Sequence, residues 1–392
     1  MEENYPKDFP PLKALDDKPQ KTTSFLVKPL PLKAAETPKG QKNLKAPVLE
    51  RDSKLISAPL KQKISPTQND PLTLASRGKK ASEGNREKLI GYYQHYLLPW
   101  VQASRPAFFV ATLFPCGLGF ILAWNSPSRP EVSIVKFILI LIACFLVHLA
   151  TNIANDFFEY REGIDKQGTI GGSRVLQEGK LSVKAILTGI LICYLTAFVL
   201  AIIIINVYKN PLAIALWALV LFAALSSFFY VAPPIKYGHR ALGELMVFVN
   251  MGLIIVVGTF MALTGSFQKD VVAIALPLSF MVASILYFQS LPEIVTDELA
   301  GKKTLAGVLG KEGASLVYLL WYPVVWLLIL VLYLCGKLSA WALLALLTVP
   351  IHIFAYLKIR RADDWLTLDK SGYLVRLLYV GNNIFLLLGA LL

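Results

Sequence analysis

The sequence predicts an all-α protein that crosses a membrane several times, and three observations support this fold class. The 392 residues are 55% hydrophobic and only 17% charged, which is too apolar for an ordinary soluble protein. The polar residues are concentrated in the first hundred positions. The rest of the chain consists of apolar stretches of about 20 residues, the length that a helix needs to cross a bilayer core.

The N-terminal region differs in composition from the rest of the chain. Residues 1–100 hold 18 of the 39 Lys and Arg residues and 12 of the 23 prolines. Residues 1–85 show no apolar periodicity, so we expect them to form a disordered, Pro- and Lys-rich cytoplasmic tail. Residues 86–104 are rich in aromatic side chains and are expected to form an amphipathic helix at the membrane interface. The net charge of +13 comes from this tail and from short loops, a distribution that suits anionic membrane lipid and not nucleic acid.

Residues 105–392 are expected to form one transmembrane domain of nine spans. An odd number of spans places the tail and the C-terminus on opposite sides of the membrane. Loops on the side of the tail and their edges hold 14 Lys and Arg residues, whereas the opposite loops and edges hold five. This bias predicts a cytoplasmic tail and an external C-terminus, in the cell inner membrane. The expected spans are 106–125, 133–156, 183–206, 211–231, 241–264, 270–290, 313–334, 338–357 and 371–391.

Acidic residues are scarce after residue 100 and fall in two clusters. Eight of the 15 carboxylates lie within 156–178 or 293–298. Carboxylates beside a bilayer core are costly, so they usually belong to a functional site. Helical spacing places Asn152, Asp156 and Glu159, at i, i+4 and i+7, on one face, and Glu293 and Asp297 are likewise an i, i+4 pair. Oxygen ligands suit Mg²⁺, so we expect the clusters to hold Mg²⁺ and a phosphorylated substrate. The candidate metal ligands are Asn152, Asp156, Glu159, Asp165, Glu293 and Asp297.

The first cluster lies in a motif that resembles a known family. The stretch NIANDFFEYREGID at 152–165, followed by GGSRVLQEGKLS, is similar to the first signature of the UbiA superfamily of membrane prenyltransferases. It is most similar to the branch that contains 1,4-dihydroxy-2-naphthoate polyprenyltransferase. The stretch EIVTDELAGKKTLAGVLG at 293–310 resembles the second signature. The resemblance extends over about residues 100–392.

This resemblance implies a nine-helix bundle around a cavity that opens to the cytoplasm and to lipid. The two acidic motifs would bind Mg²⁺ on a prenyl diphosphate, with Asp156 and Asp297 as central residues. Basic side chains would neutralise the diphosphate as it leaves, and Tyr230 would lie near the developing allylic cation. The basic residues at matching or neighbouring positions are Arg174, Lys180, Lys236 and Lys302.

Four residues either depart from the family pattern or are candidates to contact the acceptor substrate. Glu159 and Glu293 stand where the family usually has Asp, which adds a methylene to each candidate ligand side chain without removing its charge. Asn250, within the fifth span, is a candidate to hydrogen-bond the acceptor substrate, with helix packing as the alternative. His148 extends the first acidic stripe inward. It is a candidate to orient an acceptor hydroxyl or to remove a ring proton, or else it bonds a neighbouring helix.

We therefore expect a Mg²⁺-dependent enzyme that transfers a polyprenyl group from an allylic diphosphate to an aromatic quinone precursor. The favoured acceptor is 1,4-dihydroxy-2-naphthoate, alkylated by electrophilic substitution in a step of menaquinone synthesis. Homogentisate, 4-hydroxybenzoate or a glyceryl phosphate are alternative acceptors within the same family. A transporter of an anionic substrate and a non-catalytic membrane scaffold are alternatives from other classes.

Overall fold

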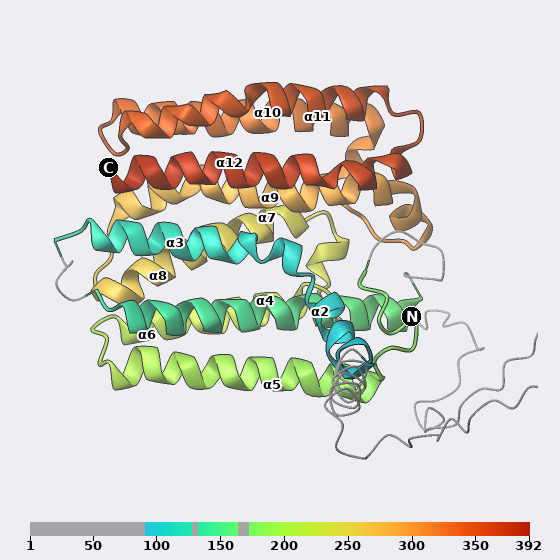
Figure 1. Cartoon of the computed structure of the whole chain (residues 1–392), viewed down its shortest axis with the longest axis horizontal. Coiled ribbons are helices and arrows are strands. Elements are labelled where there is room, and N and C mark those ends of the chain that lie inside the picture. The colour runs from blue at the N-terminus through green and yellow to red at the C-terminus, as the bar shows by residue number, and fades with distance from the viewer. Residues whose placement is uncertain (1–90, 128–131, 164–171) are drawn as a thin grey trace, which may run out of the picture. The chain divides into compact units, whose positions relative to one another are not determined.

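The computed structural model describes residues 91–127, 132–163 and 172–392, and within these ranges the chain forms helices packed side by side (Figure 1). The predicted tail 1–85 and the candidate ligand Asp165 lie outside the described residues. In chain order the elements are η2 Tyr93–Leu97, α2 Leu98–Ser104, η3 Pro106–Phe108, α3 Val110–Trp124, α4 Ile134–Glu162, α5 Val183–Ile202, η5 Ile203–Val207, α6 Ala213–Phe229, η6 Tyr237–His239, α7 Gly243–Val247, η7 Phe248–Ile254, α8 Ile255–Thr264, α9 Lys269–Leu299, α10 Leu305–Leu334, η8 Ala340–Thr348, α11 Val349–Arg361, η9 Trp365–Ser371 and α12 Gly372–Leu391.

The structure confirms the predicted all-α membrane fold. Among the described residues, seven helical segments are long and apolar enough to cross a membrane. A further pair, Tyr93–Phe108 and Val110–Trp124, passes the same test together but is bent by 54°. The helix Ala213–Phe229 is apolar but shorter. Each of the nine expected spans therefore has a helical counterpart.

Helices α4, α9 and α10 are longer than a membrane span requires, and α4 and α9 carry the acidic motifs. At 1.5 Å per residue, the 29 residues of α4 and the 31 residues of α9 give lengths of about 43 Å and 46 Å, against a hydrocarbon core of about 30 Å. The α4 helix ends at Gly163, whose φ of +69° is a left-handed cap that suits glycine. The acidic motifs occupy the last turns of both helices, so the extra length carries them towards the membrane surface.

The α9 helix is the centre of the bundle, since it is the most buried of the seven span helices in the described ranges. It packs against α10, α12, α3, α8 and η7. Tyr287 of α9 is fully buried, stacks on Trp321 of α10 at 4.9 Å between ring centroids, and donates its hydroxyl to the Ala314 carbonyl at 2.9 Å. Close packing on this helix therefore fixes the position of the second acidic motif.

One glycine sets the approach of η7 to α9. A Cβ atom on Gly252 would lie 2.2 Å from the Ser279 Oγ atom and 2.5 Å from the Ser279 Cα atom. No side chain fits there unless the two helices separate. The seven residues of η7 form a π-helix, a form that is frequent at functional sites.

We predict that Gly252→Ala lowers the free energy of unfolding by about 1–3 kcal/mol, because the added methyl group overpacks the η7–α9 contact. Thermal unfolding of the purified protein in detergent measures the effect. Gly258→Ala is the matched control, since its Cβ would meet its nearest neighbour, Leu219, at 3.9 Å. Equal unfolding temperatures for the two variants would contradict the prediction.

Candidate active site

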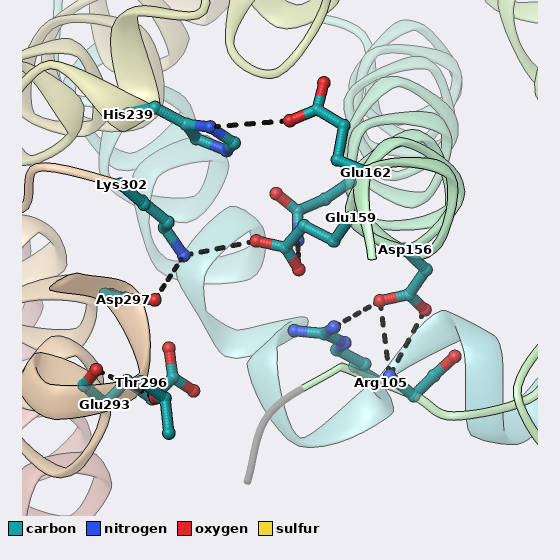
Figure 2. A network of polar contacts seen from close by, with 11 residues as sticks. Arg105, Asp156, Glu159, Glu162, His239, Glu293, Thr296, Asp297 and Lys302 are labelled. Carbon is teal, nitrogen blue, oxygen red and sulfur yellow. Dashed lines mark hydrogen bonds and ion pairs between the residues drawn. The ribbon is translucent and has the colours of Figure 1, made fainter. Parts of the chain in front are cut away.

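The structure brings the ends of α4 and α9 together, as the two acidic motifs predicted (Figure 2). Glu159 of α4 and Asp297 of α9 are both buried, with exposed fractions of 5% and 4%. The Nζ atom of Lys302 lies between them, 3.1 Å from Glu159 Oε1 and 3.3 Å from Asp297 Oδ1. We call Glu159 and Asp297 the acidic pair. Glu293 lies one helical turn before Asp297 on α9.

Lys302 is positioned by the end of α9. Its backbone N–H donates to the Asp297 carbonyl at 2.8 Å, which directs the side chain back over the helix end. Burial by itself lowers the pKa of Lys302, but the carboxylates of Glu159, Asp297 and Glu293 more than offset this, and the net pKa is raised. The ammonium group is therefore charged at physiological pH and compensates the acidic pair.

Asp156 has different partners, although it lies one turn before Glu159 on the same helix. Its carboxylate forms an ion pair with Arg105 and accepts the Ser173 backbone N–H at 3.2 Å and 3.3 Å (Figure 2). Arg105 forms the bend before α3 with a φ of +49°. Asp156 thus ties the start of the first span to Ser173. Sequence analysis assigned neither Arg105 nor Ser173 to the site.

The segment that follows Ser173 is held against α2. Gln102 donates its amide to the Ser173 carbonyl at 2.7 Å and accepts from Lys180 Nζ at 2.8 Å. Glu178 lies 2.6 Å from Lys180 Nζ and 3.7 Å from Arg174 Nε. The structure therefore groups Arg174 and Lys180 around Glu178 on this segment, and Gln102 is an anchor that sequence reasoning missed.

A second basic group lies on the other side of the α4 end. Lys236 forms an ion pair with Glu162. His239 Nδ1 lies 4.0 Å from the same carboxylate (Figure 2). Lys303 connects this loop to the loop after α9, since its N–H donates to the His239 carbonyl at 3.1 Å and its carbonyl accepts from Ala241 at 2.7 Å. Lys236 and Lys302 are thus held on linked loops.

An apolar cavity of about 810 Å³ begins beside these charges and extends between helices α3 to α9. Arg105, Asn152 and Tyr230 line the end that adjoins the acidic motifs, and most of the remaining wall is aliphatic or aromatic. Its size and composition suit an apolar ligand with a polar end. The ring of Tyr230 packs edge-on against Tyr237, with 5.4 Å between centroids.

His148 and Asn250 also line this cavity, deeper than the acidic motifs. The Thr112 Oγ1 atom lies 2.7 Å from His148 Nδ1, so Thr112 orients the imidazole ring from the neighbouring α3 helix. Phe109 packs edge-on against the same ring at 6.0 Å between centroids. The structure thus supplies the helix-to-helix contact that the sequence offered as the alternative role of His148, and the ring still borders the cavity.

The residues present fit a hard cation bound together with a phosphate. Within the described ranges, no three His, Cys, Asp or Glu side chains lie close enough to hold an ion by themselves. Mg²⁺, however, commonly takes only one or two carboxylates and fills its shell with phosphate oxygens and water. Two buried polar atoms, Asp297 Oδ2 and Asn152 Nδ2, have no hydrogen-bond partner among the described residues. Asp297 Oδ2 is an oxygen that can bind a cation, and the Asn152 amide N–H can donate to a phosphate oxygen.

Comparisons with known proteins agree with this arrangement. Residues 112–370 match the model of the UbiA prenyltransferase family. The chain is 26% identical over 253 residues to a 1,4-dihydroxy-2-naphthoate octaprenyltransferase of Bacillus subtilis, covering 64% of this chain and 78% of the relative. It is 31% identical over 259 residues to the Drosophila melanogaster homolog of UbiA prenyltransferase domain-containing protein 1, covering 65% and 69%.

A solved structure shares the fold. The UbiA homolog from Archaeoglobus fulgidus, in a structure bound to GPP and Mg²⁺, superposes with a TM-score of 0.52 at 16% identity, covering 74% of this chain and 99% of that one. The family match spans well over half of the sequence and includes both acidic motifs. The chain belongs to the UbiA prenyltransferase family and is an integral membrane prenyltransferase.

Proposed function

We propose that this protein transfers a polyprenyl group from an allylic diphosphate to an aromatic quinone precursor, with Mg²⁺ as cofactor. The observation that carries the proposal is the position of the acidic pair and Lys302 beside a long apolar cavity. A prenyl diphosphate has the same two parts, a charged head and an apolar tail. The A. fulgidus homolog bound to GPP and Mg²⁺ supports this assignment of the donor.

The residues that would hold Mg²⁺ are Glu159 and Asp297, with Asn152, Asp156, Glu293 and Asp165 as further candidates. When bound, the metal would neutralise the diphosphate, so that the allylic C–O bond breaks with its electron pair on the leaving oxygen. Arg105 and Lys302 supply fixed positive charge at the same place. Lys236, Arg174 and Lys180 lie on the surrounding loops and would bind the departing diphosphate.

The cavity would handle the carbocation that remains. The face of Tyr230 lies at the charged end of the cavity and would stabilise the cation through its ring quadrupole. The aliphatic walls exclude water, which would otherwise capture the cation. A nucleophilic ring carbon of the acceptor would then form the new C–C bond and release its former substituent.

The proposed acceptor is 1,4-dihydroxy-2-naphthoate, the substrate named for the B. subtilis relative. Loss of its carboxylate as CO₂, with the electrons of the broken C–C bond returned to the ring, would complete the substitution and give a prenylated 1,4-naphthalenediol, the reduced form of a demethyl-naphthoquinone and a precursor of menaquinone. We also infer that the site faces the cytoplasm, with the C-terminus outside the cell inner membrane. The basic bias of the loops on the side of the acidic motifs supports this orientation.

We predict that Asp297→Asn lowers prenyl transfer by roughly 100-fold or more, the size of effect seen when a group that stabilises transition-state charge is removed. The assay uses purified protein in detergent, Mg²⁺, a prenyl diphosphate and 1,4-dihydroxy-2-naphthoate, with homogentisate and 4-hydroxybenzoate in parallel. Asp270→Asn is the matched control, since Asp270 lies at the other end of α9 and pairs only with the exposed Lys337 among the described residues. Equal rates in both variants would overturn the proposal.

We predict that chelation with EDTA abolishes transfer and that added Mg²⁺ restores it, because the carboxylates of the acidic pair repel the diphosphate unless a divalent cation lies between them. Turnover is followed by chromatography of the prenylated product during a Mg²⁺ titration. Undiminished turnover after chelation would rule out the metal.

We predict that Lys302→Met destabilises the metal-free protein by roughly 3 kcal/mol, because the two buried carboxylates then face each other without a cation. Mg²⁺ should raise the unfolding temperature of this variant more than that of the wild type. The measurement is thermal unfolding with and without Mg²⁺. Lys303→Met, one residue further along, is the control and should respond like the wild type.

A further inference from the structure

A band of polar side chains crosses the otherwise apolar cavity. It lies deeper than the acidic motifs, since Thr151 precedes Asp156 by five residues on α4, about 8 Å along the helix axis. The mechanism proposed for the diphosphate does not use this band. We call it the polar girdle, and its cavity-lining members are Thr151, Tyr194, Ser227, Tyr237 and Asn250.

One hydrogen-bond chain of the girdle runs from Tyr194 to the backbone of α4. Thr151 donates its hydroxyl to the Val147 carbonyl at 2.8 Å. The contact of 2.5 Å between Thr151 and Ser227 must therefore use the Ser227 proton, because each hydroxyl has only one. Tyr194, 2.5 Å from Ser227 Oγ, then donates to Ser227. All three protons are used within the protein, and the Tyr194 oxygen keeps a free lone pair.

A second hydrogen-bond chain begins at Asn250, and its protons are likewise all donated within the protein. Both amide protons of Asn250 are used, since Nδ2 donates to Ser226 Oγ at 2.6 Å and to the Met246 carbonyl at 2.9 Å. Tyr237 donates its hydroxyl to the Ser226 carbonyl. The Ser226 hydroxyl therefore donates to the Tyr237 oxygen, 2.8 Å away. These bonds use both protons of the Asn250 amide, so only its Oδ1 atom is without a hydrogen-bond partner among the described residues.

The Oδ1 atom of Asn250 is a hydrogen-bond acceptor. Asn250 Oδ1 is buried and has no partner among the described residues. A buried acceptor without a donor is unfavourable, so such an atom in a cavity wall indicates a ligand that supplies the donor. The Tyr194 oxygen is likewise able only to accept. In both chains the protons point into the protein, and each chain ends in an acceptor on a residue that lines the cavity.

The backbone around Asn250 is shaped to hold this amide in place. Asn250 lies in the π-helix η7, and Gly252 two residues later locks that segment against Ser279 of α9. The wider π-turn and the close helix contact leave the Asn250 side chain little freedom. Its carbonyl oxygen is therefore preorganised.

We propose that the polar girdle is the subsite for the aromatic acceptor, and that Asn250 Oδ1 reads a ring hydroxyl by accepting its hydrogen bond. The inference rests on the proposed function and adds a rule of selectivity to it. An acceptor in its reduced, hydroxylated form donates the hydrogen bond that the girdle lacks. A quinone or an aryl ether brings only further acceptors and is rejected.

Equilibrium binding tests the proposal without requiring turnover. The ligands are 1,4-dihydroxy-2-naphthoate and its 1,4-dimethyl ether, titrated by calorimetry into the purified full-length protein under anaerobic conditions. We expect the wild type to bind the hydroxylated ligand at least tenfold more tightly than the ether. In Asn250→Leu, which is close in volume, the ratio should fall to within about twofold of one, while the Kd for the prenyl diphosphate stays unchanged.

Two further variants separate the hydrogen bond from general disturbance of the fold. Ser226→Ala releases one amide proton of Asn250, so we expect the ether to gain affinity relative to the hydroxylated ligand. Asn206→Leu is the control, because Asn206 is exposed and accepts from Trp217 on the surface. Its binding ratio should equal that of the wild type.

The outcomes distinguish this proposal from the proposed function. An unchanged ratio in Asn250→Leu, or a wild type that binds both ligands equally or binds neither, overturns the role of the girdle. Transfer measured on the same preparations decides the enzymatic function separately. Wild-type turnover with an unchanged ratio would leave the prenyltransferase intact and refute the subsite alone.

Discussion

The contact between Lys302 and the acidic pair is the interaction on which the rest of the site depends. Two long helices, α4 and α9, end with buried carboxylates that face each other, and like charges at that depth repel strongly. Lys302 compensates them from the loop after α9, where its own backbone is tied to Asp297. Since Lys303 joins that loop to the one that carries Lys236, the same ion pair orders both loops. A single ammonium group thereby holds the charged end of the cavity in shape.

Asp156 organises the opposite side of the site. Its carboxylate joins the bend at Arg105 to the Ser173 backbone, and Gln102 extends the connection to α2. Asp156 and the acidic pair therefore share negative charge but have different roles. The acidic pair faces a bridging cation, whereas Asp156 connects three segments that are distant in sequence. A residue that acts as a structural junction can still contribute to the field on a bound diphosphate.

Much of this arrangement could be predicted from sequence because it follows from local rules. Span positions follow from apolar length, and the shared face of Asp156 and Glu159 follows from helical spacing. The partners of those residues could not be predicted, since the contacts of Lys302 with Glu159 and of Gln102 with Ser173 join positions 143 and 71 residues apart. The orientation of the Asn250 amide could not be predicted either, because it depends on the two acceptors of its protons, Ser226 Oγ and the Met246 carbonyl. Hydrogen-bond polarity is a property of the network and not of any one residue.

The excess length of α4 and α9 has a consequence for the membrane around the protein. Each helix exceeds the hydrocarbon thickness by more than 10 Å, so a helix whose first residues lie at one edge of the hydrocarbon core carries its acidic end into the opposite headgroup layer. An amphiphilic donor can then enter from the bilayer without moving its head or its tail out of the layer that each prefers. Such a match of depth depends on bilayer thickness. Lipid chain length therefore affects how readily the donor enters the cavity, just as the donor concentration does.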